Sequence, residues 1–414
     1  MANKKLLLIS YYFPPFGGAG SGRPYGLFRH LPEFGIDVDI LTVKPIASRS
    51  FDYSLLNKTD ESRIYRSKSF DPQRIMYLFG MRTLKDKTIG KGKTASDRFF
   101  PDSKIGWVKQ AVKLGRILIE NKKYDTIMST SPSISSHLVG MKLAGEFNLK
   151  WIADFRDYWT SYKPESWYDS KSQVEKAYKL IAEITKKADA VTTVSKSIGN
   201  FLGTKDIIQN SYNTELANLW SSPKTTDRFV VGLLGTIDKL TIVEPLLKML
   251  SKLKGTEAEL FAKIKVIQVG QIHDPDFEKK LSEYNLSETI EINNFQERKT
   301  TIEMLNDSHL LYLGLNPEFE EGMLTSRVFE MIASGRPILG YTTKESELGC
   351  LIQDVKNGIT FQDDTIDVGV TYLKKNIEDW QNSKLTIIPN DTYALPYSSV
   401  EMAKKVSEII KNIL

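Results

Sequence analysis

The sequence has few of the residues that form disulfides or bind metal ions. It contains one cysteine, Cys350, and four histidines in 414 residues. A lone cysteine excludes an internal disulfide framework and a cysteine-based metal cluster, and it fits a reducing compartment. The histidines are scattered, and no two have the spacing of a metal site or a catalytic triad. We therefore expect no metal ligands, and each histidine to be an ordinary surface or core residue.

Long apolar runs and internal repeats are also missing. No stretch of about 20 apolar residues is present, so we expect no membrane-spanning helix. The apolar run near the start is short and leads into Pro14 and Pro15, which favours a buried first strand over a secretion signal. With 41% hydrophobic and 26% charged residues, the composition is typical of a folded protein. We expect a cytoplasmic location.

The charge is unevenly divided, although the net charge is only +5. Residues 1–210 carry 34 basic and 21 acidic side chains, whereas residues 211–414 carry 22 and 30. Much of the basic excess falls in residues 58–123. Three explanations remain open for this excess. The basic side chains form a solvated surface, they dock on an anionic membrane face, or they face a phosphorylated acceptor substrate. Nucleic acid is disfavoured because no recognised binding motif accompanies the charge.

Apolar strand-like runs alternate with amphipathic stretches, which is typical of parallel α/β architecture. The expected strands of the first half are 4–10, 38–43, 126–129, 149–153, 191–195 and 207–208. Those of the second half are 229–235, 264–270, 289–294, 309–315, 337–341 and 358–361. The principal expected helices are 25–31, 107–123, 135–147, 171–188, 242–253, 327–333 and 400–414. Between about 68 and 105 the pattern weakens and predicts an irregular, partly mobile excursion.

This tandem rhythm predicts two Rossmann-like domains with parallel sheets that face a central cleft. We expect an acceptor-side domain over 1–205 and a donor domain over 206–395. A C-terminal helix over 396–414 is expected to cross back to the first domain. Ligands of open α/β sheets bind beyond the carboxyl ends of the strands, so the site residues should lie in the loops that follow them.

A glycine-rich segment, FPPFGGAGSGRPYGLFRHL, occupies residues 13–31. Its glycines allow sharp turns and close approach to a ligand, and the N–H groups of the helix that follows favour an anion. The spacing is not that of a dinucleotide fingerprint. We expect Gly18 and Gly20 to contact the donor and Arg23 to contact the acceptor.

The segment WIADFRDYW, residues 151–159, places polar and aromatic groups where a strand ends. Either these groups line the binding cleft, or a structural ion pair such as Asp154–Arg156 explains them. In the first interpretation Asp154 and Asp157 orient the acceptor hydroxyl, and Arg156 and Trp159 bind the acceptor.

The most specific segment is EFEEGMLTSRVFEMIASGRPIL, residues 318–339. Thr325 or Ser326 is a suitable N-cap, and Arg327 and Glu330 share one helical face. One interpretation is a capped helix with an internal Arg327–Glu330 pair. The other places a diphosphate at the helix start, stabilised by the helix dipole and Arg327, with Glu330 bonding ribose hydroxyls.

Together with STSPSISSHLVG (129–140) and ADAVTTVS (188–195), these segments resemble the family-4 glycosyltransferases of the GT-B fold, over essentially the whole chain. The resemblance implies retaining transfer of a sugar, of the hexosyltransferase type, from a nucleoside-diphosphate sugar without an obligatory metal or other cofactor. It implies that Glu330 binds the ribose and that Arg327 meets the diphosphate. It also suggests synthesis of bacterial cell-surface polysaccharide or glycolipid, with a lipid-linked saccharide as acceptor and peripheral contact with the inner face of the membrane.

The chain departs from the family pattern at several positions. Gly322 stands where the first of two glutamates is usual, and Glu321 or Glu320 could replace it. In the phosphate-binding turn Gly235 matches, Thr236 replaces an arginine, and Lys239 lies off the usual spacing. Residues 210–213 read NSYN and keep only Asn210 of another motif. These changes shift phosphate binding towards Arg327, the Gly235–Thr236 turn and Lys239.

Three other functions share some of these features. A sugar-nucleotide epimerase has the same architecture but should carry ionisable catalytic groups around the cleft. A nicotinamide-dependent reductase would use the glycines, although their spacing disfavours it. A non-catalytic sugar-binding protein would explain the altered phosphate-binding residues.

Overall fold

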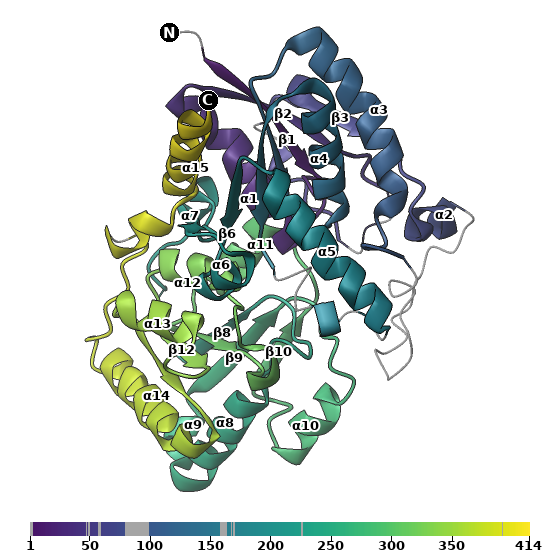
Figure 1. Ribbon diagram of the computed structural model, residues 1–414. Coiled ribbons are helices and arrows are strands. Elements are labelled where there is room, and N and C mark those ends of the chain that lie inside the picture. The colour runs from purple at the N-terminus through teal and green to yellow at the C-terminus, as the bar shows by residue number, and fades with distance from the viewer. Residues whose placement is uncertain are drawn as a thin grey trace. The chain divides into compact units, whose positions relative to one another are not determined.

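The computed structural model describes residues 3–414 except 47, 49, 57–58, 79–98, 158–163, 167, 169, 225–226 and 391. Contacts between residues divide the chain into two compact units (Figure 1). The first unit comprises Met1–Asn210 and Ser399–Leu414, and the second comprises Ser211–Ser398. No helix of the described ranges combines the length and the apolar character needed to span a membrane.

The first unit is built on a seven-stranded sheet with the order β3-β2-β1-β4-β5-β6-β7. Its paired strands run parallel, since helical crossovers connect them. The strands are β1 (Lys4–Ser10), β2 (Ile36–Val43), β3 (Ile64–Ser67), β4 (Thr126–Thr130), β5 (Lys150–Phe155), β6 (Ala190–Thr193) and β7 (Asp206–Ile207). The sequence did not predict β3, because its four residues IYRS are mostly half-buried and lack an apolar run.

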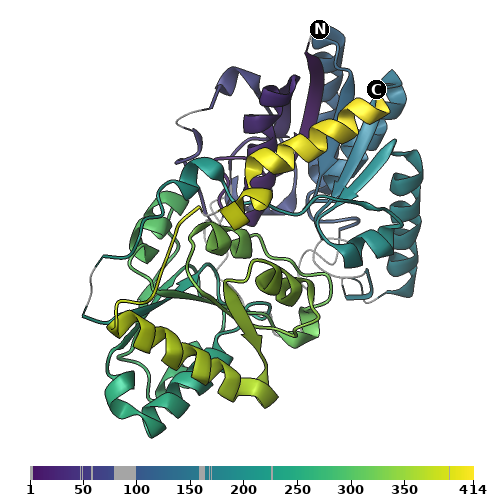
Figure 2. The same ribbon diagram turned by 90° about the vertical axis from the view of Figure 1, so that its left-hand side faces the viewer.

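Helices pack on this sheet and bury its apolar strands, among which Leu6–Ile9 of β1 are fully buried. They are α1 (Ala19–His30), α2 (Pro72–Leu78), α3 (Ile105–Lys122), α4 (Ser135–Phe147), α5 (Lys171–Lys187), α6 (Lys196–Leu202) and α15 (Ser399–Ile413). Figure 2 shows α15, in yellow, lying along α1. A Cβ added at Gly26 of α1 would lie 3.1 Å from Met402 and Ser399 of α15, so a small residue is required there. The expected return of the C-terminal helix to the first domain is confirmed.

Two sequence expectations for this unit need correction. Helix α1 begins at Ala19 rather than at Tyr25, so Gly20, Gly22 and Pro24 are helical residues. Glycine and proline disfavour helix interiors, and the sequence pattern therefore placed the start too late. The stretch expected to be irregular includes α2, and its residues 79–98 lie outside the described residues.

The second unit has a six-stranded sheet with the order β10-β9-β8-β11-β12-β13, also paired in parallel. Its strands are β8 (Phe229–Leu234), β9 (Ile264–Val269), β10 (Ile290–Asn293), β11 (Leu310–Gly314), β12 (Ile338–Tyr341) and β13 (Gly358–Phe361). Its helices are α7 (Thr214–Ala217), α8 (Glu244–Thr256), α9 (Ala258–Phe261), α10 (Phe277–Glu283), α11 (Arg298–Leu305), α12 (Arg327–Ala333), α13 (Glu347–Asp354) and α14 (Ile366–Gln381). All six strands expected in this half are confirmed.

Both sheets are doubly wound, as expected for Rossmann-like domains. Chain order reverses between β1 and β4 in the first unit and between β8 and β11 in the second. Ligands bind outside the carboxyl ends of strands at such a reversal. The loops after these strands are therefore where a site is sought in each domain.

Candidate functional site

In the first domain, Arg156 follows β5 and contacts both the loop after β4 and the first turn of α1. Its backbone N–H donates to Ser131 Oγ over 2.8 Å, and its side chain donates to the Ser131 carbonyl. Its Nη2 also donates to the Gly20 carbonyl over 3.0 Å. Burial lowers the pKa of Arg156 to about 10, although Asp157 and Asp154 oppose the shift. The side chain therefore remains a cation at neutral pH.

Pro24 makes the Gly20 carbonyl available for this contact. In an α-helix the Gly20 carbonyl would accept from the N–H of residue 24, four positions later. Proline has no N–H, so that carbonyl lacks its helical partner. Arg156 supplies the missing donor. The proline that hid the start of α1 in the sequence thus positions a cation beside the glycine-rich turn.

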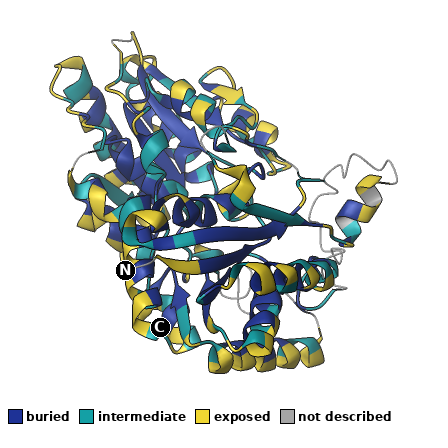
Figure 3. Cartoon of the chain, turned by 90° about the horizontal axis from the view of Figure 1, so that it is seen from above, coloured by how far each residue is buried: buried dark blue, intermediate teal, exposed yellow. Residues whose placement is uncertain are grey.

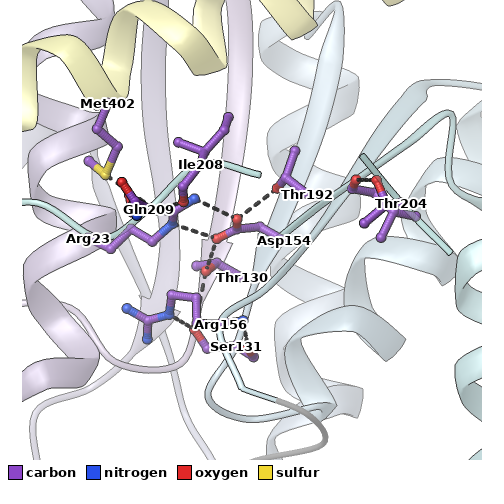
Figure 4. Close-up of polar contacts among 11 residues, drawn as sticks. Arg23, Thr130, Ser131, Asp154, Arg156, Thr192, Thr204, Ile208, Gln209 and Met402 are labelled. Atoms are coloured by element: carbon purple, nitrogen blue, oxygen red, sulfur yellow. Dashed lines mark hydrogen bonds and ion pairs between the residues drawn. The ribbon is translucent and has the colours of Figure 1, made fainter. Parts of the chain in front are cut away.

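Arg23 and Asp154 form a buried ion pair, drawn in Figure 4. Two parallel bonds join them, Nε to Oδ2 over 2.9 Å and Nη2 to Oδ1 over 2.8 Å. Thr130 and Thr192 each donate a hydroxyl to the same carboxylate. Burial by itself would raise the pKa of Asp154, but the Arg23 charge and these donors hold it below its ordinary value.

This geometry changes the interpretation of both residues. The expected structural pair Asp154–Arg156 does not form, because Arg23 takes the carboxylate and Arg156 turns to the Gly20 and Ser131 carbonyls. Asp154 is fully buried and Arg23 is 3% exposed. With its oxygens already engaged, Asp154 is not placed to bond an acceptor hydroxyl. The pair positions the ends of β4, β5 and β6 instead of presenting groups to a ligand.

Asp157 follows Arg156 and has a different environment. Burial raises the pKa of its carboxyl to about 6, although Arg156 opposes the shift. Its side chain is half-buried, so it is the carboxyl of this segment that remains a candidate for contact with substrate. Trp159, the other expected acceptor-binding residue, lies outside the described residues.

The glycine-rich turn leads directly into α1. Gly18 has a φ of +86°, which favours glycine, and it precedes the helix without any side-chain cap. Ser21 in the first turns is 2% exposed, and its hydroxyl has no partner among the described residues. The turn therefore combines uncapped helical N–H groups with an unused buried hydroxyl, a combination suited to an anion or a sugar hydroxyl.

In the second domain, Arg327 lies against the turn that follows β8. Its Nη1 donates to the Thr236 carbonyl over 3.0 Å and its Nη2 to Thr241 Oγ1 over 3.1 Å. Its Nε donates to Thr325 Oγ1 over 3.2 Å. Gly235 has a φ of +97°, and a Cβ there would lie 2.7 Å from Arg327 Cδ. The turn therefore needs glycine both for its backbone and for the close approach of arginine.

Hydrogen bonds to the Asp238 carboxylate fix the rest of this turn. Its Oδ1 accepts bonds from the backbone N–H groups of Leu240 and Thr241 and from the Thr241 hydroxyl. Lys239, at the tip, lies 5.6 Å above the ring of Phe319. Thr236, Lys239 and Arg327 therefore gather at the chain reversal between β8 and β11.

The start of α12 only partly follows the expected capping. The Thr325 hydroxyl accepts from the Arg327 N–H over 3.3 Å, whereas Ser326 makes no side-chain cap. The expected pair between Arg327 and Glu330 is wrong, because Glu330 pairs with Arg298 at the start of α11. That contact spans 32 residues, and no local pattern in the sequence announces it.

The acidic segment before α12 makes contacts that the sequence did not predict. Glu320 accepts bonds from the backbone and side chain of Thr343 and from the Thr342 hydroxyl, all after β12. Glu321, the residue expected to bind the donor, is exposed. Gly322 has a φ of +69°, a conformation that a glutamate would rarely adopt. The chain therefore turns at Gly322, and Glu320 braces the loop after β12.

Two of the four histidines are core residues. His137 and His309 are buried in different domains, and burial lowers their pKa to about 3 and about 4. His309 stacks on Phe229, as a core side chain does. Within the described ranges no three His, Cys, Asp or Glu side chains gather as ligands of a metal ion.

Comparisons with known proteins support the architecture. No protein-family model and no curated protein sequence matches the chain. Solved structures do match over its whole length. A sucrose-phosphate synthase from Thermosynechococcus elongatus has a TM-score of 0.69 and 14% identity, covering 99% of both chains. The Anabaena protein HepE, in complex with UDP and glucose, has a TM-score of 0.64 and 14% identity, covering 99% of this chain and 100% of that one.

A structure of another activity matches with a lower score. It is a putative UDP-N-acetylglucosamine 2-epimerase from Listeria monocytogenes, with a TM-score of 0.50 and 12% identity, covering 99% of this chain and 96% of that one. At such identities these likenesses concern the fold. The chain has the GT-B fold, with two Rossmann-like domains built on parallel sheets.

Proposed function

We propose that this protein is a retaining glycosyltransferase that moves a sugar from a nucleoside-diphosphate sugar to a hydroxyl acceptor. The GT-B fold, the motif over residues 318–339 and the UDP and glucose bound to HepE support this function. The single observation that carries the proposal is the environment of Arg327. It lies at the reversal of the second sheet, where a ligand of such a domain binds.

The charge of Arg327 is held in place but not neutralised. Its hydrogen-bond partners are carbonyl and hydroxyl oxygens, and the ion pairs found among the described residues do not include it. Burial lowers the pKa of Arg327, against the more distant charges of Asp238 and Glu330. A half-buried cation with neutral partners gains most from an anionic ligand, and a diphosphate provides one.

In the proposed reaction, breaking the bond between sugar and phosphate leaves negative charge on the departing diphosphate. Arg327, the Gly235–Thr236 turn and Lys239 stabilise that charge, with Thr325 and Ser326 beside them. Glu330 accepts from the ribose hydroxyls, and Arg298 orients its carboxylate. In a front-face retaining reaction the leaving phosphate takes the acceptor's proton, so no separate base is required.

The first domain binds the acceptor in this proposal and contributes Gly18 and Gly20 to donor binding. Gly18 and Gly20 present backbone N–H groups, and Arg156 supplies a cation close to them. Asp157 orients the acceptor hydroxyl, and Trp159 stacks on a sugar ring. Arg23 and Asp154 act as positioning residues that hold the strand ends, and they do not contact the acceptor directly.

We propose a lipid-linked saccharide as the acceptor, in the synthesis of bacterial surface polysaccharide or glycolipid. The basic excess of residues 1–210 supports this choice, because such acceptors carry phosphate. The reaction would then take place in the cytoplasm, at the inner face of the membrane.

The decisive experiment compares Arg327→Ala with the unchanged protein. A panel of nucleotide sugars is first screened for thermal stabilisation, and transfer and donor hydrolysis are then measured with the sugar that stabilises most. We expect Arg327→Ala to lower turnover by at least about 100-fold, because leaving-group charge loses its main stabiliser. Arg116→Ala, on an exposed face of α3, is the matched control and should retain activity. Unchanged turnover of Arg327→Ala at saturating donor would refute the role of Arg327.

A sugar-nucleotide epimerase is the second candidate, favoured by the Listeria structure and by the raised pKa of Asp157. An epimerase converts one nucleotide sugar into another without an acceptor. Incubation of the protein with the stabilising donor alone therefore separates the two. A new nucleotide sugar indicates epimerisation, whereas free nucleoside diphosphate indicates transfer to water.

A further inference from the structure

Gln268 places a polar side chain inside a largely apolar strand. It lies near the end of β9, in the sequence IKVIQVG, and is fully buried. The central strands β8 and β11 of the same sheet are buried throughout, and buried residues are dark blue in Figure 3. An amide in such a sheet needs hydrogen-bond partners, because burying it without them is costly. The partners that Gln268 takes therefore indicate its role.

The amide of Gln268 bonds two backbone carbonyls that follow neighbouring strands. Its Nε2 donates to the Gly235 carbonyl, after β8, over 3.2 Å and to the Gly270 carbonyl, after β9, over 3.1 Å. Both partners are acceptors, so the nitrogen of the amide faces them and the oxygen does not. The Oε1 atom has no partner among the described residues. Gln268 therefore acts as a double donor that joins the turns after β8 and β9.

The two turns are also joined along their backbones. The Gly235 N–H donates to the Val269 carbonyl over 2.8 Å, and the Ile237 N–H donates to the Gln271 carbonyl over 2.9 Å. A Cβ at Gly270, where φ is +148°, would lie 2.3 Å from the Gly235 carbonyl oxygen. Glycine is therefore required at position 270 for this close approach. The backbone groups of residues 235 and 237 both face the segment that continues β9.

Thr236, between these two residues, faces the other way. The peptide bond between Gly235 and Thr236 is trans, so its C=O and N–H point in opposite directions. Because the Gly235 carbonyl points to Gln268, the Thr236 N–H points away from it. In the part of the chain that the structure describes, this N–H has no hydrogen-bond partner.

Arg327 lies on the side to which Thr236 turns. Its Nη1 donates to the Thr236 carbonyl over 3.0 Å and to the Leu234 carbonyl over 3.4 Å. Residues 234 and 236 alternate with residues 235 and 237, and alternate residues of an extended segment direct their backbone groups to opposite sides. The turn after β8 therefore combines an arginine charge with an unused N–H on the side away from β9.

We propose that Gln268 is a positioning residue for the donor diphosphate. By fixing the Gly235 carbonyl it keeps the Thr236 N–H directed to the side of Arg327, so that a cation and a backbone donor bind the same phosphates. If this peptide rotated, its carbonyl oxygen would face the diphosphate and repel it. The proposal rests on the donor site proposed above, and it adds a residue that sets phosphate affinity without contacting the ligand.

The test compares Gln268→Met with Gln353→Met in the full chain. Gln353 is the matched control, because its Nε2 also donates to two carbonyls of the second domain, those of Lys344 and Gly349. The ligands are the nucleoside diphosphate and the nucleoside of the nucleotide sugar that most stabilises the chain. Calorimetry measures the affinity for the first, and competition with the first measures the affinity for the second.

We expect Gln268→Met to weaken the nucleoside diphosphate at least about tenfold and the nucleoside less than about twofold, because the turn acts on the phosphates alone. Gln353→Met should bind both ligands as the unchanged protein does. If Gln268→Met melts well below the unchanged protein, Gln268→Glu takes its place, since it keeps the shape of the side chain. A carboxyl group donates at most one hydrogen bond, so the same loss of diphosphate affinity is expected.

Two results would overturn the proposal. Equal losses of affinity for the nucleoside diphosphate and the nucleoside would indicate a general distortion of the domain. Unchanged affinity for the nucleoside diphosphate would show that the turn keeps its conformation without Gln268. Arg327→Ala then separates this proposal from the proposed function. If Arg327→Ala weakens the diphosphate and Gln268→Met does not, only the role of Gln268 is refuted, whereas two unaffected variants would refute the donor site as well.

Discussion

The Arg23–Asp154 pair is the residue contact that most constrains the first domain. The two side chains are 131 positions apart in the sequence and are both almost fully buried. Arg23 Nη1 also donates to the carbonyls of Ile208 and Gln209, so a single guanidinium joins α1, β5 and the segment that follows β7. Removing one charge of such a pair leaves the other buried without compensation.

We therefore expect Asp154→Asn to lower the free energy of unfolding by about 3–5 kcal/mol. Glu146→Gln, which breaks the exposed pair with Arg116, should cost less than about 1 kcal/mol. Denaturant titration of both variants measures the difference. The pKa of Asp154 is below its ordinary value, so its contribution is present at neutral pH and is lost as pH falls through that lowered pKa. Equal costs for the two variants would contradict this view of the pair.

Asp157 has the opposite pH behaviour, because its pKa is raised to about 6. Its carboxyl is ionised above this pH and protonated below it, so transfer that needs the carboxylate should decline as pH falls through about 6. Asp157→Asn should lower turnover and remove that acidic limb from the pH profile. The effect of Asp157 on stability runs the other way. The native state binds the Asp157 proton more tightly than the unfolded state does, so the free energy of unfolding falls as pH rises from about 4 to 6. An acidic limb that persists in Asp157→Asn would assign it to another group.

At the scale of elements, the turn after β8 couples backbone conformation to the proposed donor site. Gly235→Ala introduces strain at a φ of +97° and also a Cβ that collides with Arg327. Gly203→Ala introduces strain at a φ of +73° but meets no atom within 4 Å. Both variants should lose more than about 1 kcal/mol of stability, measured by thermal unfolding, and Gly235→Ala should lose more than Gly203→Ala because of the collision. Only Gly235→Ala should weaken donor binding, measured by calorimetry. Equal donor affinity of the two variants would contradict a role of Arg327 in donor binding.

The sequence predicted elements where apolar runs were long and failed where they were short or broken. The LLLI run of β1 and the whole set β8 to β13 were predictable because buried parallel strands are continuously apolar. The start of α1 was not, since Pro24 and three glycines resemble a loop. Of the candidate site, the sequence singled out Arg327, Gly235 and Glu330. Arg298 was assigned no role, and Glu320 was considered only as a replacement for a glutamate at position 322. Their observed contacts depend on which strands lie side by side.

At the scale of the whole molecule, the second domain should fold by itself. Residues 211–398 contain a complete sheet with apolar clusters on both faces, and a domain with its own core can fold independently. We expect this fragment to unfold in one cooperative transition and to be stabilised by the nucleotide sugar that most stabilises the full chain, as measured by calorimetry. The fragment 1–210 lacks α15, so it exposes the face of α1 that α15 covers and should be less stable than the first domain of the full chain. A fragment 211–398 without cooperative unfolding would refute the expectation.

The return of α15 to the first domain has a consequence for synthesis on the ribosome. The first domain is formed by two segments of the chain, and the second domain lies between them in the sequence. Domains generally fold as units and in the order in which they emerge. Here the domain that begins to emerge first lacks α15 until the second domain has been synthesised. The nascent chain therefore carries an uncovered α1 throughout synthesis of the second domain, and chaperone contact is most needed during that interval.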